Sequence, residues 1–216
     1  MQTILTLIPL FLAIILHEIA HGFVAHLLGD DTAKNKGRLS LNPVKHIDTV
    51  GTVILPLLLW ISNAGFIFGW AKPVPYNPNN LKKRNRDEII VAAAGIVMNL
   101  CLAITSALLL VLVAFIPSPY VRGIFGIFCV NMIIFNVGLA VFNAIPIPPL
   151  DGSKILFGGI NKSWAKNYLK SDKYGLMIMV LLLFILPAIG DNLGIDLNII
   201  RNYIIATTRY ICSFLL

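Results

Sequence analysis

Long apolar segments are the feature that most constrains this sequence. Hydrophobic residues make up 57% of its 216 residues and charged residues only 12%, whereas a soluble domain carries about 25% charged residues. A bilayer core of about 30 Å needs roughly 20 apolar residues of helix. Five segments approach this length, namely 3–28, 50–70, 89–116, 124–145 and 174–190. We therefore expect a polytopic membrane protein and exclude both a soluble globule and a disordered chain.

The charged residues lie mainly in the loops, and their distribution indicates which loops lie on the cytoplasmic side. Basic loops flank the segment 50–70 on both sides, and a third basic loop covers 146–173. Since Lys and Arg collect on the cytoplasmic side, all three loops lie inside if 50–70 is re-entrant. We favour this topology over an ordinary span. A sixth segment, 196–216, contains three charged residues and is either a marginal span or an interfacial helix.

The fold class that follows is all-α and polytopic, with about five to six transmembrane or re-entrant segments. The short alternating pattern of residues 38–42, between Gly37 and Pro43, predicts a small β-region after the first helix. We expect a single membrane domain over residues 1–216, with a core at about 3–160 and C-terminal helices at 174–216.

Two function classes are disfavoured by charge and cysteine content. The net charge of +7 comes from 17 basic and 10 acidic residues. The basic residues are scattered over several loops, so we expect no nucleic-acid partner. The three cysteines form no CxxC pair, which argues against a disulfide framework or a thiolate metal site.

The first apolar segment carries a metal-binding pattern. His17, Glu18 and His21 form the sequence H-E-x-x-H. On a helix this spacing places both imidazoles on one face, and neutral imidazole nitrogens suit zinc. Glu18 lies beside them and could accept a proton from metal-bound water. Burying these groups in lipid without a function would cost several kcal/mol, so we favour a zinc site over a polar contact between helices.

A catalytic zinc site usually has three protein ligands and one open position, so a third ligand is needed. Asp151 follows a proline-rich stretch after the segment 124–145. Three prolines in four residues cannot continue a helix, and Gly152 permits a close approach of the chain. The alternative is that Asp151 caps a helix starting near Ser153. Together with H-E-x-x-H, we favour Asp151 as the third ligand of one Zn²⁺ per chain.

Asparagines recur in the later apolar segments. Asn143 begins the proline-rich turn and could hold the substrate backbone or stabilise an oxyanion. Asn99 could bind substrate in the same way, or it could hydrogen-bond between helices. For Asn131 and Asn136 we expect plain helix contacts.

Together these motifs resemble the site-2 protease family of intramembrane zinc metalloproteases. The resemblance spans about residues 3–160. It rests on His17-Glu18-Ile-Ala-His21, Gly95-x-x-x-Asn99 and Asn143-Ala-Ile-Pro-Ile-Pro-Pro-Leu-Asp151-Gly152. It implies a zinc ion bound by His17, His21 and Asp151, with Glu18 as general base, and hydrolysis of peptide bonds in or near transmembrane segments.

The resemblance further implies a compact form without PDZ or CBS domain, in a prokaryotic cytoplasmic membrane. The favoured topology places the active site nearer the cytoplasmic side, because His17 lies roughly 16 Å from the basic end of the first segment and the Asp151 loop enters from the same side. The expected partners are the lipid bilayer and a transmembrane protein or peptide, cleaved in regulated proteolysis or in clearance of membrane peptides. A substrate helix must unwind, and residues 38–42, with Leu39 and Leu41, are the candidate edge for β-addition. The sequence leaves the oligomeric state open, a homo-oligomer included.

Two alternatives stay open. Other membrane proteases with H-E-x-x-H use a downstream glutamate as third ligand, but only Glu88 follows His21, beside a basic loop. The chain could also be a catalytically inactive or metal-binding membrane protein. The presence of Glu18 and of all three expected ligands counts against that reading.

Overall fold

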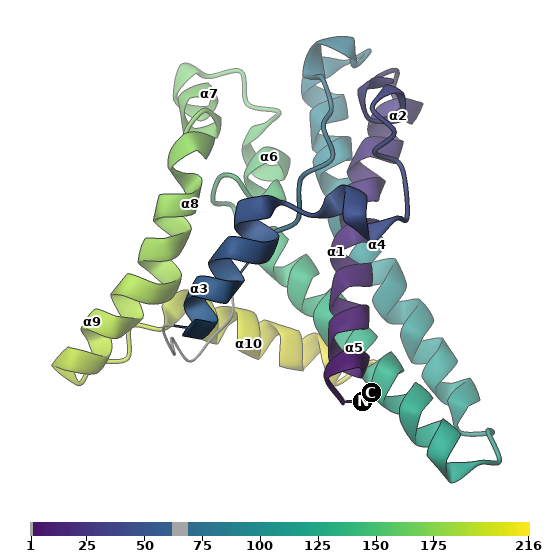
Figure 1. Cartoon of the computed structure of the whole chain (residues 1–216). Helices are drawn as coiled ribbons and strands as arrows, with labels where there is room; N and C mark the ends of the chain where they lie inside the picture. The colour runs from purple at the N-terminus through teal and green to yellow at the C-terminus, as the bar shows by residue number, and fades with distance from the viewer. Residues whose placement is uncertain (1, 62–68) are drawn as a thin grey trace.

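Three long helices form the centre of the molecule (Figure 1). The computed structural model describes residues 2–61 and 69–216. The central helices are α1 (Gln2–Leu27), α4 (Arg84–Val113) and α5 (Pro119–Asn143), and each packs against the other two. Their apolar parts have mean hydropathies of 2.1, 2.6 and 2.3. Helices of this length and composition can cross a bilayer, so the chain is a membrane protein.

Local signals set the ends of the central helices. Asp87 accepts a hydrogen bond from the backbone N–H of Lys83 at 2.7 Å, which secures the start of α4. The side chain of Ser118 caps α5, and Pro119 stands at its first position. Prolines shortly after Asn143 stop α5.

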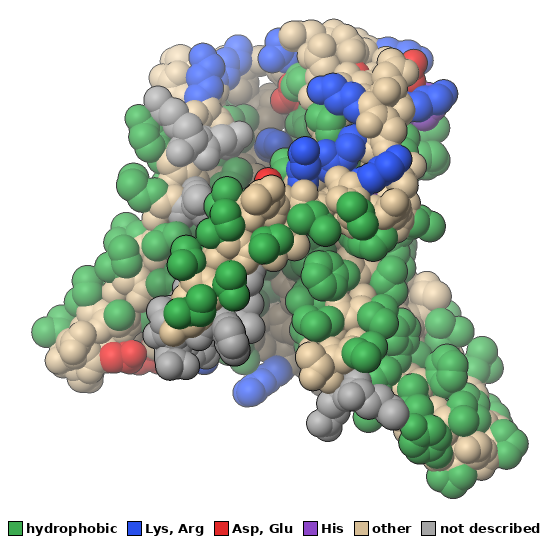
Figure 2. All heavy atoms as spheres, in the orientation of Figure 1, with side chains coloured by type: hydrophobic (Ala, Val, Ile, Leu, Met, Phe, Trp, Pro, Cys, Tyr) green, Lys and Arg blue, Asp and Glu red, His purple; other side chains and the backbone are tan. Residues whose placement is uncertain are grey.

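The outer surface of the bundle is apolar, and the charge lies at its ends. Figure 2 shows hydrophobic side chains along the flanks, with Lys and Arg gathered at the end where α2 (Thr32–Asn35) and α7 (Ser163–Leu169) lie. Leu108 and Phe115 are 66% and 79% exposed, as expected for side chains that face lipid. The interior holds small clusters, one of which joins Ala103 of α4 to Ile133 of α5.

The C-terminal third forms a bent rod followed by a crossing helix (Figure 1). After α6 and α7, the rod runs without interruption through α8, η4 and α9, and the next helix is α10. Their bounds are Asp151–Phe157 (α6), Asp172–Val180 (α8), Leu181–Ile185 (η4), Leu186–Leu193 (α9) and Ile199–Cys212 (α10). The 14-residue α10 is about 21 Å long at 1.5 Å per residue, which favours the interfacial alternative for segment 196–216. The described apolar part of the rod, Met177–Leu193, is shorter than a span, so its crossing stays a prediction.

The segment 50–70, interpreted as re-entrant, is only partly described. It begins with η2 (Thr49–Ile54) and α3 (Leu55–Ile61). Residues 62–68, where the chain would turn back, lie outside the described residues. The re-entrant topology therefore stays a prediction.

The predicted small β-region is wrong, since the described residues contain no strand. Residues 38–42 run without regular structure into the 3₁₀ turn η1 (Pro43–His46). His46 Nε2 donates a hydrogen bond to the Ser40 carbonyl at 2.7 Å. Pro43 has no N–H that could pair with a neighbouring strand. The side chain of Arg38 donates one hydrogen bond to the Lys72 carbonyl at 2.8 Å, and no ladder forms among the described residues.

An extended segment, residues 70–76, lies along α1 and is called the strap below. Single hydrogen bonds fix its first half, from Trp70 N–H to the Gly51 carbonyl at 3.1 Å and from Lys72 N–H to the His46 carbonyl at 2.8 Å. Past its far end, before the 3₁₀ turn η3 (Pro78–Asn80), Asp30 accepts a hydrogen bond from Asn77 N–H at 2.6 Å. The strap is thus fixed at both ends.

Candidate metal centre

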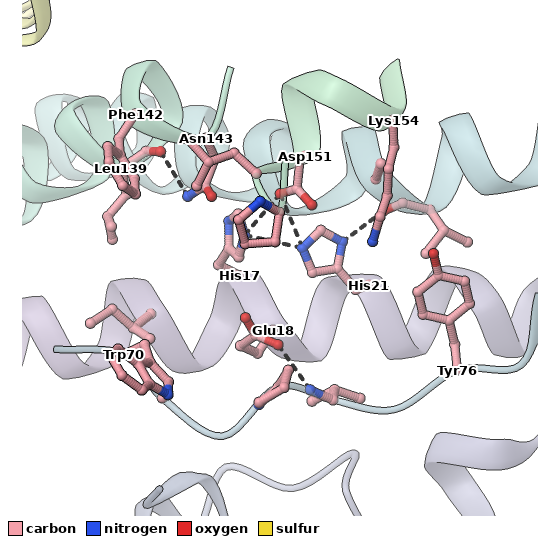
Figure 3. Close-up of a pocket in the computed structure, with 18 of the residues that line it drawn as sticks. His17, Glu18, His21, Trp70, Tyr76, Leu139, Phe142, Asn143, Asp151 and Lys154 are labelled. Carbon is pink, nitrogen blue, oxygen red and sulfur yellow. Dashed lines mark hydrogen bonds and ion pairs between the residues drawn. The ribbon is translucent and has the colours of Figure 1, made fainter. Parts of the chain in front are cut away.

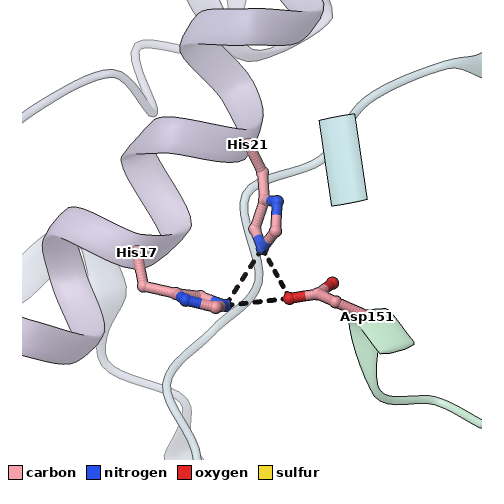
Figure 4. A group of neighbouring side chains, drawn as sticks. All are labelled: His17, His21 and Asp151. Carbon is pink, nitrogen blue, oxygen red and sulfur yellow. Dashed lines mark hydrogen bonds and ion pairs between the residues drawn. The ribbon is translucent and has the colours of Figure 1, made fainter. Parts of the chain in front are cut away.

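Three side chains from two distant parts of the chain meet in the interior (Figure 4). His17 and His21 lie one turn apart on α1, and Asp151 is the first residue of α6. The two histidine Nε2 atoms lie 3.0 Å from each other. They lie 3.2 and 3.3 Å from Asp151 Oδ2. His17 and His21 are 6% and 9% exposed, so both imidazoles are buried.

The far side of each imidazole ring is bound to an oxygen acceptor. His17 Nδ1 donates to Asn99 Oδ1 at 2.6 Å, and His21 Nδ1 donates to the Val91 carbonyl at 2.7 Å. With the proton on Nδ1, a neutral ring presents the lone pair of Nε2. Two such lone pairs and one carboxylate oxygen therefore face the same point.

This donor set fits a tetrahedral metal ion. At zinc–ligand distances of about 2.0–2.1 Å, tetrahedral ligand atoms lie about 3.3 Å apart, close to the 3.0–3.3 Å found here. Asp151 Oδ2 is buried and accepts no hydrogen bond from the described residues. A cation would satisfy that oxygen and both lone pairs at once.

One face of α4 supports both imidazoles. Val91, Gly95 and Asn99 recur at intervals of four residues and so lie on one side of that helix. A Cβ on Gly95 would lie 2.4 Å from His17 Cε1 and 2.6 Å from His21 Nε2. Only glycine leaves room there for the two rings.

The proline-rich turn after α5 brings Asp151 to the histidines. A Cβ on Gly152 would lie 2.2 Å from the carbonyl oxygen of Ala144, so the glycine permits the predicted close approach. Leu150 is the N-cap of α6, and Asp151 is already within the helix. Asp151 is therefore not the N-cap of a helix that starts near Ser153.

Glu18 lies beside the centre and is held by the strap (Figure 3). Its Oε2 accepts a hydrogen bond from Val74 N–H at 2.9 Å. Both histidines, Glu18 and Asp151 line a cavity of about 480 Å³, whose other walls include the strap and parts of α4, α5, α6 and α8. The cavity therefore brings a further carboxylate next to the candidate metal position.

The other predicted site residues lie at different distances from the centre. Asn143 lines the cavity, and its Nδ2 donates to the Leu139 carbonyl at 3.0 Å. Asn99 is fully buried behind His17 and is not among the cavity-lining residues. Leu39 packs over Gly22 of α1, whereas Leu41 is 70% exposed. Neither leucine belongs to a strand, because none forms in that part of the chain.

Sequence reasoning did not find several residues that shape the site. Val91 acts through its carbonyl and Val74 through its N–H, and a backbone group leaves no signal in the side-chain pattern. Lys154 lines the cavity and lies over the ring of Tyr76, 5.6 Å from its centre. The spacing of Lys154 from Asp151, three residues along a helix, could have indicated that it faces the same side.

Two imidazoles and a carboxylate at one point, with a further carboxylate beside them in a bundle of membrane helices, define a metallohydrolase-type centre. The model of peptidase family M50 matches residues 120–186, which include Asp151 but not the histidines. The curated relatives include "Putative zinc metalloprotease YwhC" of Bacillus subtilis (strain 168), 38% identical over 83% of this chain and 80% of that protein. They also include "Putative zinc metalloprotease Rip2" of Mycolicibacterium smegmatis, 30% identical over 87% of this chain and 69% of that protein.

The chain therefore belongs to peptidase family M50, the site-2 protease family, as its motifs predicted. It is a membrane protein of a family of metalloproteases, and the family implies zinc. A comparison with solved structures finds no match.

Proposed function

We propose that this protein is an intramembrane zinc protease that cleaves peptide bonds in or near the transmembrane segments of membrane proteins or peptides. The observation that carries the proposal is the convergence of His17 Nε2, His21 Nε2 and Asp151 Oδ2 within 3.3 Å of one another. These three residues would hold one zinc ion. Zinc at this site supplies polarisation of the substrate carbonyl and a nucleophilic water near neutral pH.

Glu18 is the general base of the proposed reaction. One of its oxygens accepts a hydrogen bond from Val74 N–H at 2.9 Å, which positions the carboxylate to take a proton from the attacking water. Glu18 then passes this proton to the amine that leaves. Asn143, at the end of α5, reaches the cavity and can hydrogen-bond the substrate backbone near the bond that is cleaved.

The substrate is proposed to come from the membrane. The cavity lies between helices whose outer surfaces are apolar, and its lining is mostly apolar, with Trp70, Phe142 and Met179 among the lining residues. Such a cavity suits a hydrophobic peptide segment. Release of a membrane-tethered factor and clearance of membrane peptides are the two roles that the family suggests.

The active site is proposed to lie nearer the cytoplasmic side of a prokaryotic cell membrane. Lys and Arg gather at one end of the molecule (Figure 2), and such residues collect on the cytoplasmic side. The basic end of α1 is at Leu27, and His17 lies ten residues before it. At 1.5 Å per residue this is a depth of about 15 Å.

The rival with a glutamate ligand is not favoured. The only glutamate after His21 is Glu88, and its carboxylate binds Arg84 at 3.3 Å near the start of α4. A non-enzymatic metal-binding protein would need no base beside the centre, whereas Glu18 lies there.

The first test is the metal content of the detergent-purified protein. We expect about one zinc per chain in the wild type and a much lower content in Asp151→Ala, since three ligands are the usual complement. Asp191→Ala is the matched control, because Asp191 is exposed on α9, and it should keep its zinc. Full zinc in Asp151→Ala would contradict the assignment of the third ligand.

A further inference from the structure

Two asparagines are completely buried between the three central helices. Asn99 of α4 and Asn136 of α5 both have an exposed fraction of 0%. We propose that Asn136 is a positioning residue that acts through Asn99 to hold His17 in the tautomer that binds zinc. The proposal rests on the zinc centre of the proposed function and adds a residue that does not touch that centre.

The chain of hydrogen bonds starts at a backbone carbonyl, which can only accept. Asn136 Nδ2 donates to the Met132 carbonyl at 2.8 Å, so Asn136 Oδ1 must point the other way. That oxygen accepts a hydrogen bond from Asn99 Nδ2 at 2.8 Å. Asn99 Nδ2 also donates to the Ala13 carbonyl at 3.2 Å.

The orientation of Asn99 then fixes the proton on His17. Because its amide nitrogen is bound to two acceptors, Asn99 presents Oδ1 to His17 Nδ1, at 2.6 Å. An oxygen acceptor requires the proton on Nδ1 and leaves a lone pair on Nε2. A reversed amide would instead offer an N–H to Nδ1, which favours the tautomer that carries its proton on Nε2. That tautomer cannot bind a metal through Nε2.

A comparison within α5 separates this role from that of an ordinary contact between helices. Asn131 also joins α5 to α1, through a hydrogen bond from Nδ2 to the Leu5 carbonyl at 2.9 Å. That bond ends on the backbone and reaches no metal ligand. The Oδ1 of Asn136 instead accepts a hydrogen bond from Asn99, and Asn99 is itself hydrogen-bonded to His17. Interhelical hydrogen bonds of both kinds stabilise the bundle, but only the second kind bears on the zinc site.

The test measures zinc affinity by competition with a chelator of known affinity, in detergent, for the wild type and leucine variants. Loss of the direct partner in Asn99→Leu should weaken zinc binding about 10- to 100-fold. Asn136→Leu should weaken it less, by about three- to tenfold, because the Ala13 carbonyl still holds the Asn99 amide. Asn131→Leu is the matched control and should bind zinc as the wild type does.

The double variant tests whether Asn136 acts through Asn99. In the Asn99→Leu background, Asn136→Leu should cost less than about a factor of two in zinc affinity, since the path to His17 is already cut. Asn136→Asp is the rescue variant. A buried carboxyl in this apolar setting stays neutral, so its carbonyl can accept from Asn99 and its hydroxyl can donate to Met132. Its zinc affinity should lie near that of the wild type.

Several outcomes would overturn the inference. Wild-type affinity in Asn136→Leu would do so, as would an equal loss in Asn131→Leu, which would mean that loosening of the bundle is the cause. If Asn136→Leu does not fold, Asn136→Ala takes its place with the same expectation. A wild-type protein that binds no zinc would overturn the proposed function together with this inference, whereas the other two outcomes would leave the zinc centre intact.

Discussion

Glu18 Oε2 accepts a hydrogen bond from the backbone N–H of Val74 at 2.9 Å. Val74 stands between Pro73 and Pro75, neither of which has an N–H, so it is the one donor of that triplet. Its side chain packs against Gly22, which lies one turn after Glu18 on the same face of α1. The position of the proposed general base therefore depends on how the strap packs against α1.

Filling the space at Gly22 should impair catalysis without removing the metal. A Cβ there would lie 2.5 Å from Val74 Cγ1 and 2.9 Å from Leu39 Cδ2, so we expect Gly22→Val to push Val74 away from α1 and to shift its N–H, the donor to Glu18. We expect kcat to fall about 10- to 100-fold, since small misplacements of catalytic groups have costs of this size. The measurements are kcat on a transmembrane peptide and the zinc content, which should be unchanged.

The control for this variant is Gly126→Val. Beyond its chain neighbours and the nearby backbone of α5, no atom of the described residues lies within 4 Å of a Cβ at Gly126, so the larger side chain meets open space. It should retain wild-type kcat. A Gly22→Val protein with wild-type kcat would show that the strap does not position Glu18.

A methyl group at Gly95 should weaken zinc binding instead. It would lie 2.4 Å from His17 Cε1 and 2.6 Å from His21 Nε2, so Gly95→Ala forces both rings out of the positions in which they face Asp151. Overpacking of this kind costs about 1–3 kcal/mol in stability. We expect zinc content to fall well below that of Gly123→Ala, whose methyl group would contact nothing in the described part of the chain beyond its own helix. Equal zinc in the two variants would argue against the histidines as ligands.

Replacing Glu18 by Gln should separate metal binding from chemistry. The amide oxygen of Gln can still accept from Val74 N–H, so the local structure is kept, but the side chain can no longer take a proton. Cleavage should fall by at least about 100-fold, the usual contribution of a general base, with zinc retained. Glu88→Gln, at the only other glutamate, should cleave normally. Cleavage by pure Glu18→Gln protein, or loss of zinc in Glu88→Gln, would favour the rival assignments.

The part of the site that the sequence predicted depends on local rules. The spacing of His17 and His21 fixes their relative position on any helix. The prolines after Asn143 end α5, and Gly152 allows the close turn that carries Asp151 to them. These signals span few residues, and together with the family resemblance they were enough to name the three groups that the structure brings together.

The parts that sequence reasoning missed depend on contacts between distant residues. Whether residues 38–42 form a strand depends on a partner strand, and the neighbouring strap offers single hydrogen bonds because Pro73 and Pro75 lack donors. Likewise, an asparagine in a membrane helix can contact substrate, backbone or another side chain. The packing of α4 against α1 and α5 decides this for Asn99, and no local pattern reports it.

Acid should loosen the anchor at the far end of the strap. Asp30 is buried, which by itself raises its pKa, but hydrogen bonds from Thr32, Asn77 and Asn80 outweigh burial and hold the pKa below the usual 3.8. Its contribution to stability is therefore complete above the unfolded pKa and is lost as the pH falls through the lower folded pKa. Thermal unfolding in detergent from about pH 7 to about pH 3 should show this loss.

Asp30→Asn, which turns an N–H toward one of these donors, should be less stable at neutral pH by about 1–3 kcal/mol and show a flatter acid response. Asp191→Asn, at an exposed site on α9, should follow the wild type, and an Asp30→Asn profile parallel to the wild type would contradict the role of Asp30.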